Sequence, residues 1–146
     1  MIPRVGEPVV PGKTYIHRPG AYAILIRRGH VLLTYQDNLN EPEVQLPGGG
    51  VDPGENPIPA LHREILEETG WRAKGLKRLG AFRRFTYMED YGFWAEKVCH
   101  IYLGQPTIRV SDPIEPAHTP LWVSPDMAIQ MVENDGDRMF LKELFG

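Results

Sequence analysis

Residues 55 to 71 constrain the fold most strongly, because they describe one short helix with fixed ends and an acidic side. Asn56 is a favoured N-cap, and Pro57 suits the first helical position, where a missing N–H costs nothing. Gly70 supplies the C-terminal stop. Between these ends, three carboxylates fall within about a 100° arc, and the neighbouring arc should face the core. The acids are Glu64, Glu67 and Glu68, and the core-side residues are Ile58, Leu61, Ile65, Leu66 and Thr69.

The three glutamates repel one another. Like charges three or four residues apart destabilise a helix by roughly tenths of a kcal/mol per pair. Arg63 can reach Glu67 one turn further on and relieves part of this repulsion. Mg²⁺ or Mn²⁺ would relieve the rest, because both prefer oxygen ligands. Such a helix alone is more often a solvated acidic face. The preceding loop, residues 46 to 50, favours a site instead, because its glycines allow close approach of the backbone to a ligand.

The spacing of the fixed residues in this stretch resembles the Nudix box, G-x5-E-x7-R-E-U-x-E-E-x-G-U, where U is apolar. The matching residues are Gly49, Glu55, Arg63, Glu64, Ile65, Glu67, Glu68, Gly70 and Trp71. Trp71 is a mild departure, since that position usually holds an aliphatic residue. The resemblance implies an α/β fold, a Nudix-type α/β/α sandwich with a mixed sheet and a central catalytic helix. It also implies an Mg²⁺- or Mn²⁺-dependent hydrolase that cuts a pyrophosphate bond in a nucleoside diphosphate linked to another group.

The same resemblance assigns roles to particular residues. The expected metal ligands are the Gly48 carbonyl and the side chains of Glu64, Glu67, Glu68 and Glu115. Glu115 is the candidate for a further acid from a later loop, and its rivals are Glu89, Asp90 and Glu96. Glu55 and Arg63 are expected to orient the ligands, a role whose loss is typically costly. The general base would be Glu64 or a loop carboxylate.

Outside the box, hydrophobic periodicity predicts strands that alternate with helices. The expected strands are residues 21–26, 31–35, 44–46, 76–88, 97–103 and 121–123. A tight turn over residues 27–30 joins the first two strands as a hairpin. Ser124 should cap a helix that runs through Val132, and residues 140–145 should form a final helical turn. The prolines before residue 20 predict an irregular start, and one domain over residues 1–146 accommodates all of these elements.

Composition excludes little, and it fits a small enzyme. A net charge of −3 and a hydrophobic fraction of 42% are ordinary for a globular protein and show no basic excess for duplex nucleic acid. Cys99 is the only cysteine, so no intramolecular disulfide can form. Without an apolar N-terminal region or a membrane-length apolar run, we expect a cytoplasmic protein. The sequence leaves the oligomeric state open, a homodimer included.

The residues that recognise the substrate should lie between residues 72 and 120, a region that carries little of the family pattern. Aromatic side chains cluster from Tyr87 to Trp94, just after two arginines. Aromatic faces stack on bases, and Arg holds phosphate, so Arg83, Tyr91 and Trp94 are candidate nucleotide-binding residues. The alternative is that the aromatic side chains pack the core. A nucleotide is favoured over a sugar or inorganic polyphosphate, with oxidised deoxynucleoside triphosphates, dinucleoside polyphosphates and nucleotide sugars as candidates.

Other functional classes remain open at this point. The fold also occurs in isoprenoid diphosphate isomerases and base-excision glycosylases, but a complete box on so short a chain argues against both. The main alternative is a non-catalytic nucleotide-binding Nudix module. Such modules commonly lose acids from the box, whereas all four glutamates are present here. Hydrolysis is therefore the favoured activity.

Overall fold

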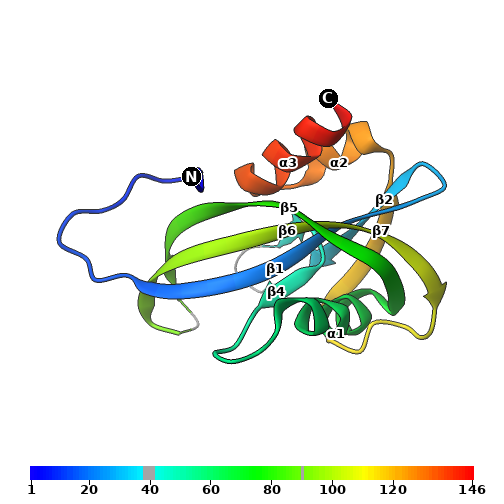
Figure 1. The fold of residues 1–146 in the computed structure, drawn as a ribbon, viewed down its shortest axis with the longest axis horizontal. Coiled ribbons are helices and arrows are strands. Elements are labelled where there is room, and N and C mark those ends of the chain that lie inside the picture. Colours follow the sequence, from blue (N-terminus) through cyan, green and yellow to red (C-terminus); the bar gives the residue numbers. More distant parts are fainter. Residues whose placement is uncertain (38–41, 90) are drawn as a thin grey trace.

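The strands form one mixed sheet between two layers of helices (Figure 1). A computed structural model describes residues 1–37, 42–89 and 91–146 of the chain. The elements are β1 (Ile16–Arg27), β2 (His30–Gln36), β3 (Glu43–Gln45), β4 (Gly48–Gly50), α1 (Pro57–Thr69), β5 (Trp71–Met88), β6 (Phe93–Arg109), β7 (His118–Val123), α2 (Pro125–Met131) and α3 (Asp135–Phe145). Helix α1 lies on one face of the sheet, and α2 and α3 lie on the other. The predicted α/β/α sandwich is confirmed.

Strand β1 is the centre of the sheet, whose order is β3-β2-β1-β6-β5. It runs parallel to β6 for most of its length. On its other edge, β2 pairs only with its last two residues, Ile26 and Arg27, whereas β4 pairs with residues 20–22. Strand β7 extends the sheet along β2. The glycines of β4 are therefore held against the middle of the sheet, next to α1.

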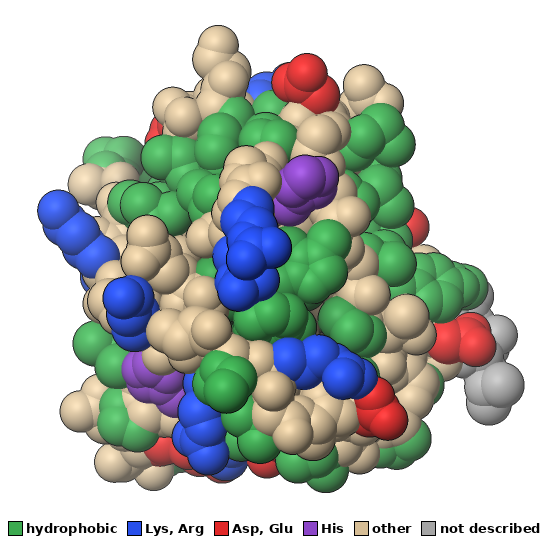
Figure 2. All heavy atoms as spheres, turned by 90° about the vertical axis from the view of Figure 1, so that its right-hand side faces the viewer, with side chains coloured by type: hydrophobic (Ala, Val, Ile, Leu, Met, Phe, Trp, Pro, Cys, Tyr) green, Lys and Arg blue, Asp and Glu red, His purple; other side chains and the backbone are tan. Residues whose placement is uncertain are grey.

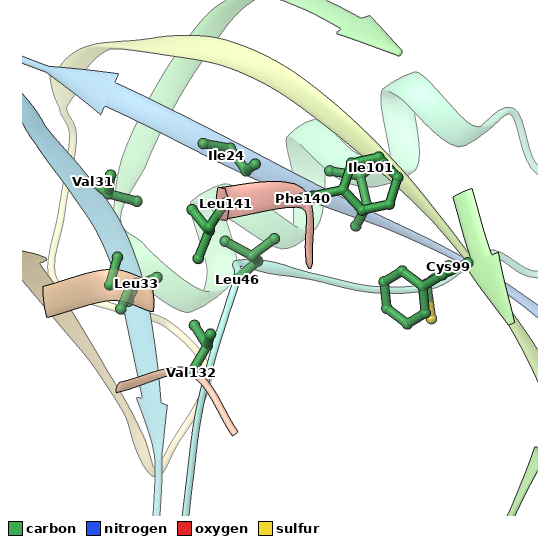
Figure 3. Close-up of a cluster of buried hydrophobic side chains, with 11 residues drawn as sticks. Ile24, Val31, Leu33, Leu46, Cys99, Ile101, Val132, Phe140 and Leu141 are labelled. Carbon is green, nitrogen blue, oxygen red and sulfur yellow. The ribbon is translucent and has the colours of Figure 1, made fainter. Parts of the chain in front are cut away.

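Two hydrophobic cores lie on opposite faces of the sheet. Strand β1 contributes to both, because Ile24 and Leu25 point to opposite faces of the pleat. The larger core packs the sheet against α2 and α3 and includes Phe140 and Leu141 (Figure 3). The smaller core lies under α1, where Ile65 meets the other face. A strand buried on both faces explains the continuous apolar run at residues 21–26.

Helix α1 has the predicted caps. The Asn56 side chain accepts a hydrogen bond from the Ile58 N–H, and Gly70 adopts a left-handed conformation with φ of 77°. Leu61, Ile65 and Thr69 are buried as expected. The prediction was wrong for Ile58, which is 40% exposed because the buried contact with the sheet begins further along the helix.

The element boundaries differ from the prediction mainly at solvent-facing ends. Strand β1 begins earlier, β5 begins directly after the α1 C-cap, and β6 continues to Arg109. These extensions carry polar or mixed residues, so no apolar run marks them. The C-terminal turn is a full helix, α3, capped by Asn134. The sequence also predicts a polar loop over residues 36–42, of which residues 38–41 lie outside the described residues. None of the helices in the described part of the chain is long and apolar enough to cross a membrane.

Candidate active site

The glycine strand β4 lies directly against the acidic side of α1. The Gly48 N–H donates a hydrogen bond to Glu68 Oε1 at 3.1 Å. A Cβ atom on Gly49 would lie 2.9 Å from Glu64 Cδ, so only glycine leaves room for that carboxylate. Gly48 also has a φ of 148°, which L side chains rarely adopt. These glycines therefore let two carboxylates approach the backbone of the sheet.

A cluster of three carboxylates forms beside this contact. Glu64, Glu67 and Glu115 each offer an oxygen, and these oxygens lie within 4.8 Å of one another. The backbone N–H groups of Ile114 and Glu115 donate to the Glu67 carbonyl at 2.8 and 2.9 Å. That carbonyl belongs to the last turn of the helix, where no intrahelical donor remains. The helix end thus anchors the loop that carries Glu115.

The rivals of Glu115 lie elsewhere or outside the described residues. Glu96 lies 3.4 Å from His17 and 3.6 Å from Arg83, on the sheet rather than beside α1. Glu89 is exposed at the end of the β5–β6 hairpin. Asp90 is outside the described residues.

Glu68 is hydrogen-bonded to Glu64 but is not one of the three clustered carboxylates. Its side chain is almost fully buried, and this burial raises its pKa to about 9, although the hydrogen bond from Gly48 opposes the change. Glu64 shares a hydrogen bond with Glu68, and burial raises the pKa of Glu64 as well. Without a cation, the site therefore retains a proton on Glu68 at neutral pH. A bound cation would favour the ionised form.

Arg63 joins the box residues to one another. Its guanidinium lies 3.1 Å from Glu55, 3.3 Å from Glu64 and 3.6 Å from Glu67. Glu55 also accepts a hydrogen bond from the Asp52 N–H at 3.1 Å, and this bond, aided by Arg63, lowers the pKa of Glu55. The arginine is thus placed to hold two cluster carboxylates in position while Glu55 fixes the arginine.

A small cavity of about 110 Å³ opens beside β4. Its lining comprises Arg18, Pro19, Gly20, Tyr22, Gly50, Met88, Tyr91, Lys97 and Cys99. The Arg18 guanidinium lies 5.0 Å from the centre of the Tyr91 ring, which is 58% exposed. The cavity combines cationic groups with an exposed aromatic ring, and its residues Tyr22 and Cys99 belong to the sheet face that carries the larger core.

Of the three predicted substrate-binding residues, only Tyr91 lines this cavity. Trp94 packs edge-to-face against Tyr15 and Tyr87 at 6.0 and 5.3 Å. Arg83 pairs with Glu96 at 3.6 Å. Arg18 and Lys97 also line the cavity, although they were not among the predicted residues, and they pair in the parallel register of β1 and β6. The sequence signal for this cavity is that Arg18, Gly20 and Tyr22 alternate along one strand. This alternation indicates a cavity only once the pairing of β1 with β6 is known.

Known proteins share both this fold and its sequence pattern. A NUDIX hydrolase from Nitrosomonas europaea superposes with a TM-score of 0.70 over 88% of this chain and 87% of that chain, at 21% identity. The mixed sheet with its acid-bearing helix is thus the fold of Nudix hydrolases. The NUDIX domain family model matches residues 16–144, so the chain belongs to the Nudix family and is a Nudix hydrolase.

Curated relatives of the chain are named as enzymes acting on nucleotides. A Bacillus subtilis protein named "Putative 8-oxo-dGTP diphosphatase" is 32% identical over 82% of this chain and 75% of that protein. A CMP-5'-(N-acetyl-N-hydroxy-3-aminopropyl)phosphonate hydrolase of Streptomyces rubellomurinus is 29% identical over 82% of this chain. The chain spans 58% of the length of that second relative. Both names contain a nucleotide, which is 8-oxo-dGTP in the first and CMP joined to a phosphonate in the second.

Proposed function

We propose that this hydrolase uses Mg²⁺ or Mn²⁺ to cleave a pyrophosphate bond in a nucleoside diphosphate linked to a further group. The observation that carries this proposal is the three-carboxylate cluster of Glu64, Glu67 and Glu115, with oxygens within 4.8 Å of one another. An all-oxygen donor set fits a hard divalent cation. When bound, the cation would neutralise charge on the phosphate oxygens and lower the pKa of the attacking water.

Residues of the box and of the loop that carries Glu115 have separate roles in this reaction. Glu64, Glu67 and Glu115 would hold the cation, and Glu68 and the Gly48 carbonyl would be its further ligands. Arg63 orients the carboxylates of Glu64 and Glu67, which it contacts directly. A proton from the attacking water passes to Glu64 or Glu115, and the water oxygen bonds to phosphorus as the bridging oxygen leaves.

The nucleotide part of the substrate lies in the cavity beside Gly50. Tyr91 stacks on the base, and Arg18 and Lys97 meet the negative charge of the phosphates. Support comes from the lining of that cavity, which combines two basic side chains with an exposed aromatic ring. The names of both curated relatives contain a nucleotide, which agrees with this assignment.

A substrate panel tests the proposal. Nucleoside triphosphates (oxidised deoxynucleotides included), dinucleoside polyphosphates and nucleotide sugars would be incubated with the protein and Mg²⁺ or Mn²⁺, and products separated by chromatography. At least one class should be hydrolysed, and Glu64→Gln should abolish the reaction. Glu143→Gln, an exposed glutamate of α3, is the matched control and should retain it. Nucleotide binding without turnover across the panel would instead favour the non-catalytic module.

A further inference from the structure

A second cavity, of about 330 Å³, lies at the end of the molecule that carries the β1–β2 turn. Its lining residues are Arg27, Arg28, His30, Trp71 and Trp122. None of them belongs to the carboxylate cluster or to the cavity beside Gly50. Figure 2 shows this end of the molecule, where basic and hydrophobic side chains lie side by side near the middle of the face.

The walls of this cavity are two indole rings brought together by the fold. Trp71 is the first residue of β5, directly after the α1 C-cap, and Trp122 lies in β7. Their ring centroids are 5.3 Å apart with an interplanar angle of 79°. Trp71 occupies the box position that is usually aliphatic, so the aromatic wall is a departure of this chain from the family pattern.

The remaining lining groups are basic and come from one hairpin. The turn has positive φ at Arg28 and Gly29, as a two-residue type I′ hairpin requires. This turn sets Arg27 opposite His30, and the Arg27 guanidinium lies 5.2 Å from the Trp71 ring centre. Within the described part of the chain, the lining contains no carboxylate, and neither arginine forms an ion pair. The cavity therefore has unbalanced positive charge.

We propose that this cavity is a second nucleotide site, which binds a nucleoside phosphate with its base against the indoles and its phosphate on Arg28 and His30. Flat rings gain stacking energy from indoles, and guanidinium groups bind phosphate through paired hydrogen bonds. The volume lies within the usual range for small-molecule sites, about 300–1,000 Å³. The site needs no pyrophosphate bond in its ligand, so it goes beyond the proposed hydrolysis.

Tryptophan fluorescence provides a direct readout, since the chain has three tryptophans and two of them line the cavity. The background variant is Trp94→Phe, which leaves only Trp71 and Trp122 as reporters. AMP and GMP are suitable probes, because they contain no pyrophosphate bond to hydrolyse. We expect saturable quenching by either nucleotide. Adenosine, measured by quenching, and inorganic phosphate, measured by its competition with AMP, should each bind at least tenfold more weakly than AMP. Equal binding of AMP and inorganic phosphate would overturn the role of the indoles.

Two arginine variants in that background locate the binding. Arg28→Asn keeps a residue that tolerates positive φ, and it should weaken binding about tenfold through loss of a charged hydrogen bond. Arg18→Gln removes an arginine from the cavity beside Gly50 and should leave the quenching unchanged. Circular dichroism checks that both variants fold. Absence of quenching at millimolar nucleotide, unchanged affinity in folded Arg28→Asn, or lost quenching in folded Arg18→Gln would each overturn the proposal. Intact quenching with a silent hydrolysis panel would reject only the proposed catalysis.

Discussion

Glu68 combines two opposing properties: it belongs to the box acids, and its side chain is buried. Burial raises its pKa to about 9, well above the ordinary glutamate value of 4.5. In the metal-free protein, folding therefore takes up a proton at this residue between about pH 4.5 and 9. Its contribution to stability is fully present below pH 4.5 and is lost as the pH rises towards 9.

Glu68→Gln should therefore act oppositely on activity and on stability. Gln keeps the shape and removes the charge, so kcat should fall by several orders of magnitude if Glu68 supports the cation. In EDTA, the variant should melt at a higher temperature than the wild type, and the difference should grow from about pH 4.5 towards pH 9. Thermal unfolding across this pH range measures the effect. A pH-independent difference would contradict the assigned cause, and full activity would place the site elsewhere.

Asp137 predicts a second pH dependence, and it belongs to α3, on the sheet face opposite α1. It is fully buried, burial raises its pKa to about 7, and it accepts a hydrogen bond from the Leu46 N–H at 3.3 Å. Stability should therefore fall as the pH rises from about 4 to 7. Asp137→Asn keeps the hydrogen-bond acceptor, so its free energy of unfolding should exceed that of the wild type. This gain should grow across that pH window, up to about a few kcal/mol, and then level off. Urea unfolding measures it, and exposed Asp126→Asn should show no such gain.

Tyr91 and Trp94 are neighbours in sequence whose substitutions should have different effects. Tyr91 lines the cavity beside Gly50, so Tyr91→Ala should raise KM about ten- to a hundredfold with a smaller change in kcat. Trp94 packs against Tyr15 and Tyr87, so Trp94→Ala should lower the melting temperature and leave KM of the folded fraction unchanged. The reverse pattern would assign the stacking role to Trp94.

At the scale of elements, the end of α1 organises the loop that carries Glu115. The Gly70 carbonyl accepts a hydrogen bond from the Val110 N–H at 2.7 Å. A Cβ atom on Gly70 would collide with the Ser111 carbonyl, whereas one on Gly54 would meet nothing within 4 Å. Both glycines have positive φ, 77° and 80°. Gly54 is thus a matched control for Gly70.

Gly70→Ala should destabilise the protein more than Gly54→Ala does. Each substitution carries a strain of about 1–2 kcal/mol from a left-handed non-glycine residue. Only Gly70→Ala adds the collision with the loop, and only it should also weaken the binding of Mg²⁺ by displacing Glu115. Urea unfolding and metal titration measure both effects. Equal losses in the two variants would show that the loop adjusts freely.

The sequence predicted elements and site residues whose signals are local. The α1 caps depend on Asn56 and Gly70 alone, and the β1–β2 turn depends on four consecutive residues, so both were predicted correctly. Glu115 was predicted through the family resemblance, and the structure brings it to Glu64 and Glu67. Arg18 and Lys97 were missed because only the long-range pairing of β1 with β6 brings them to one cavity. The burial of Glu68 was likewise invisible, since an acid on a helix gives no local sign of what covers it.

At the scale of the whole molecule, a cation should stabilise the fold as well as support turnover. A ligand that binds only the folded state raises stability with its concentration relative to Kd. Activity should vanish in EDTA and return with Mg²⁺ or Mn²⁺, and added cation should raise the melting temperature. Glu67→Gln should lose much of this rise, whereas Glu143→Gln should keep it. Full turnover in chelator would contradict the mechanism.

The parallel pairing of β1 with β6 has a consequence for how the chain acquires its shape. His17 on β1 meets Glu96 on β6, a separation of 79 residues. Contacts so distant along the chain slow folding, because the entropy of closing the intervening loop is lost before the contact forms. During synthesis from the N-terminus, β1 emerges well before this partner and leaves that edge unpaired meanwhile. Aggregation during refolding should therefore depend on how quickly β6 pairs with β1. A charged residue added on the edge of β1 that is still unpaired should suppress this aggregation.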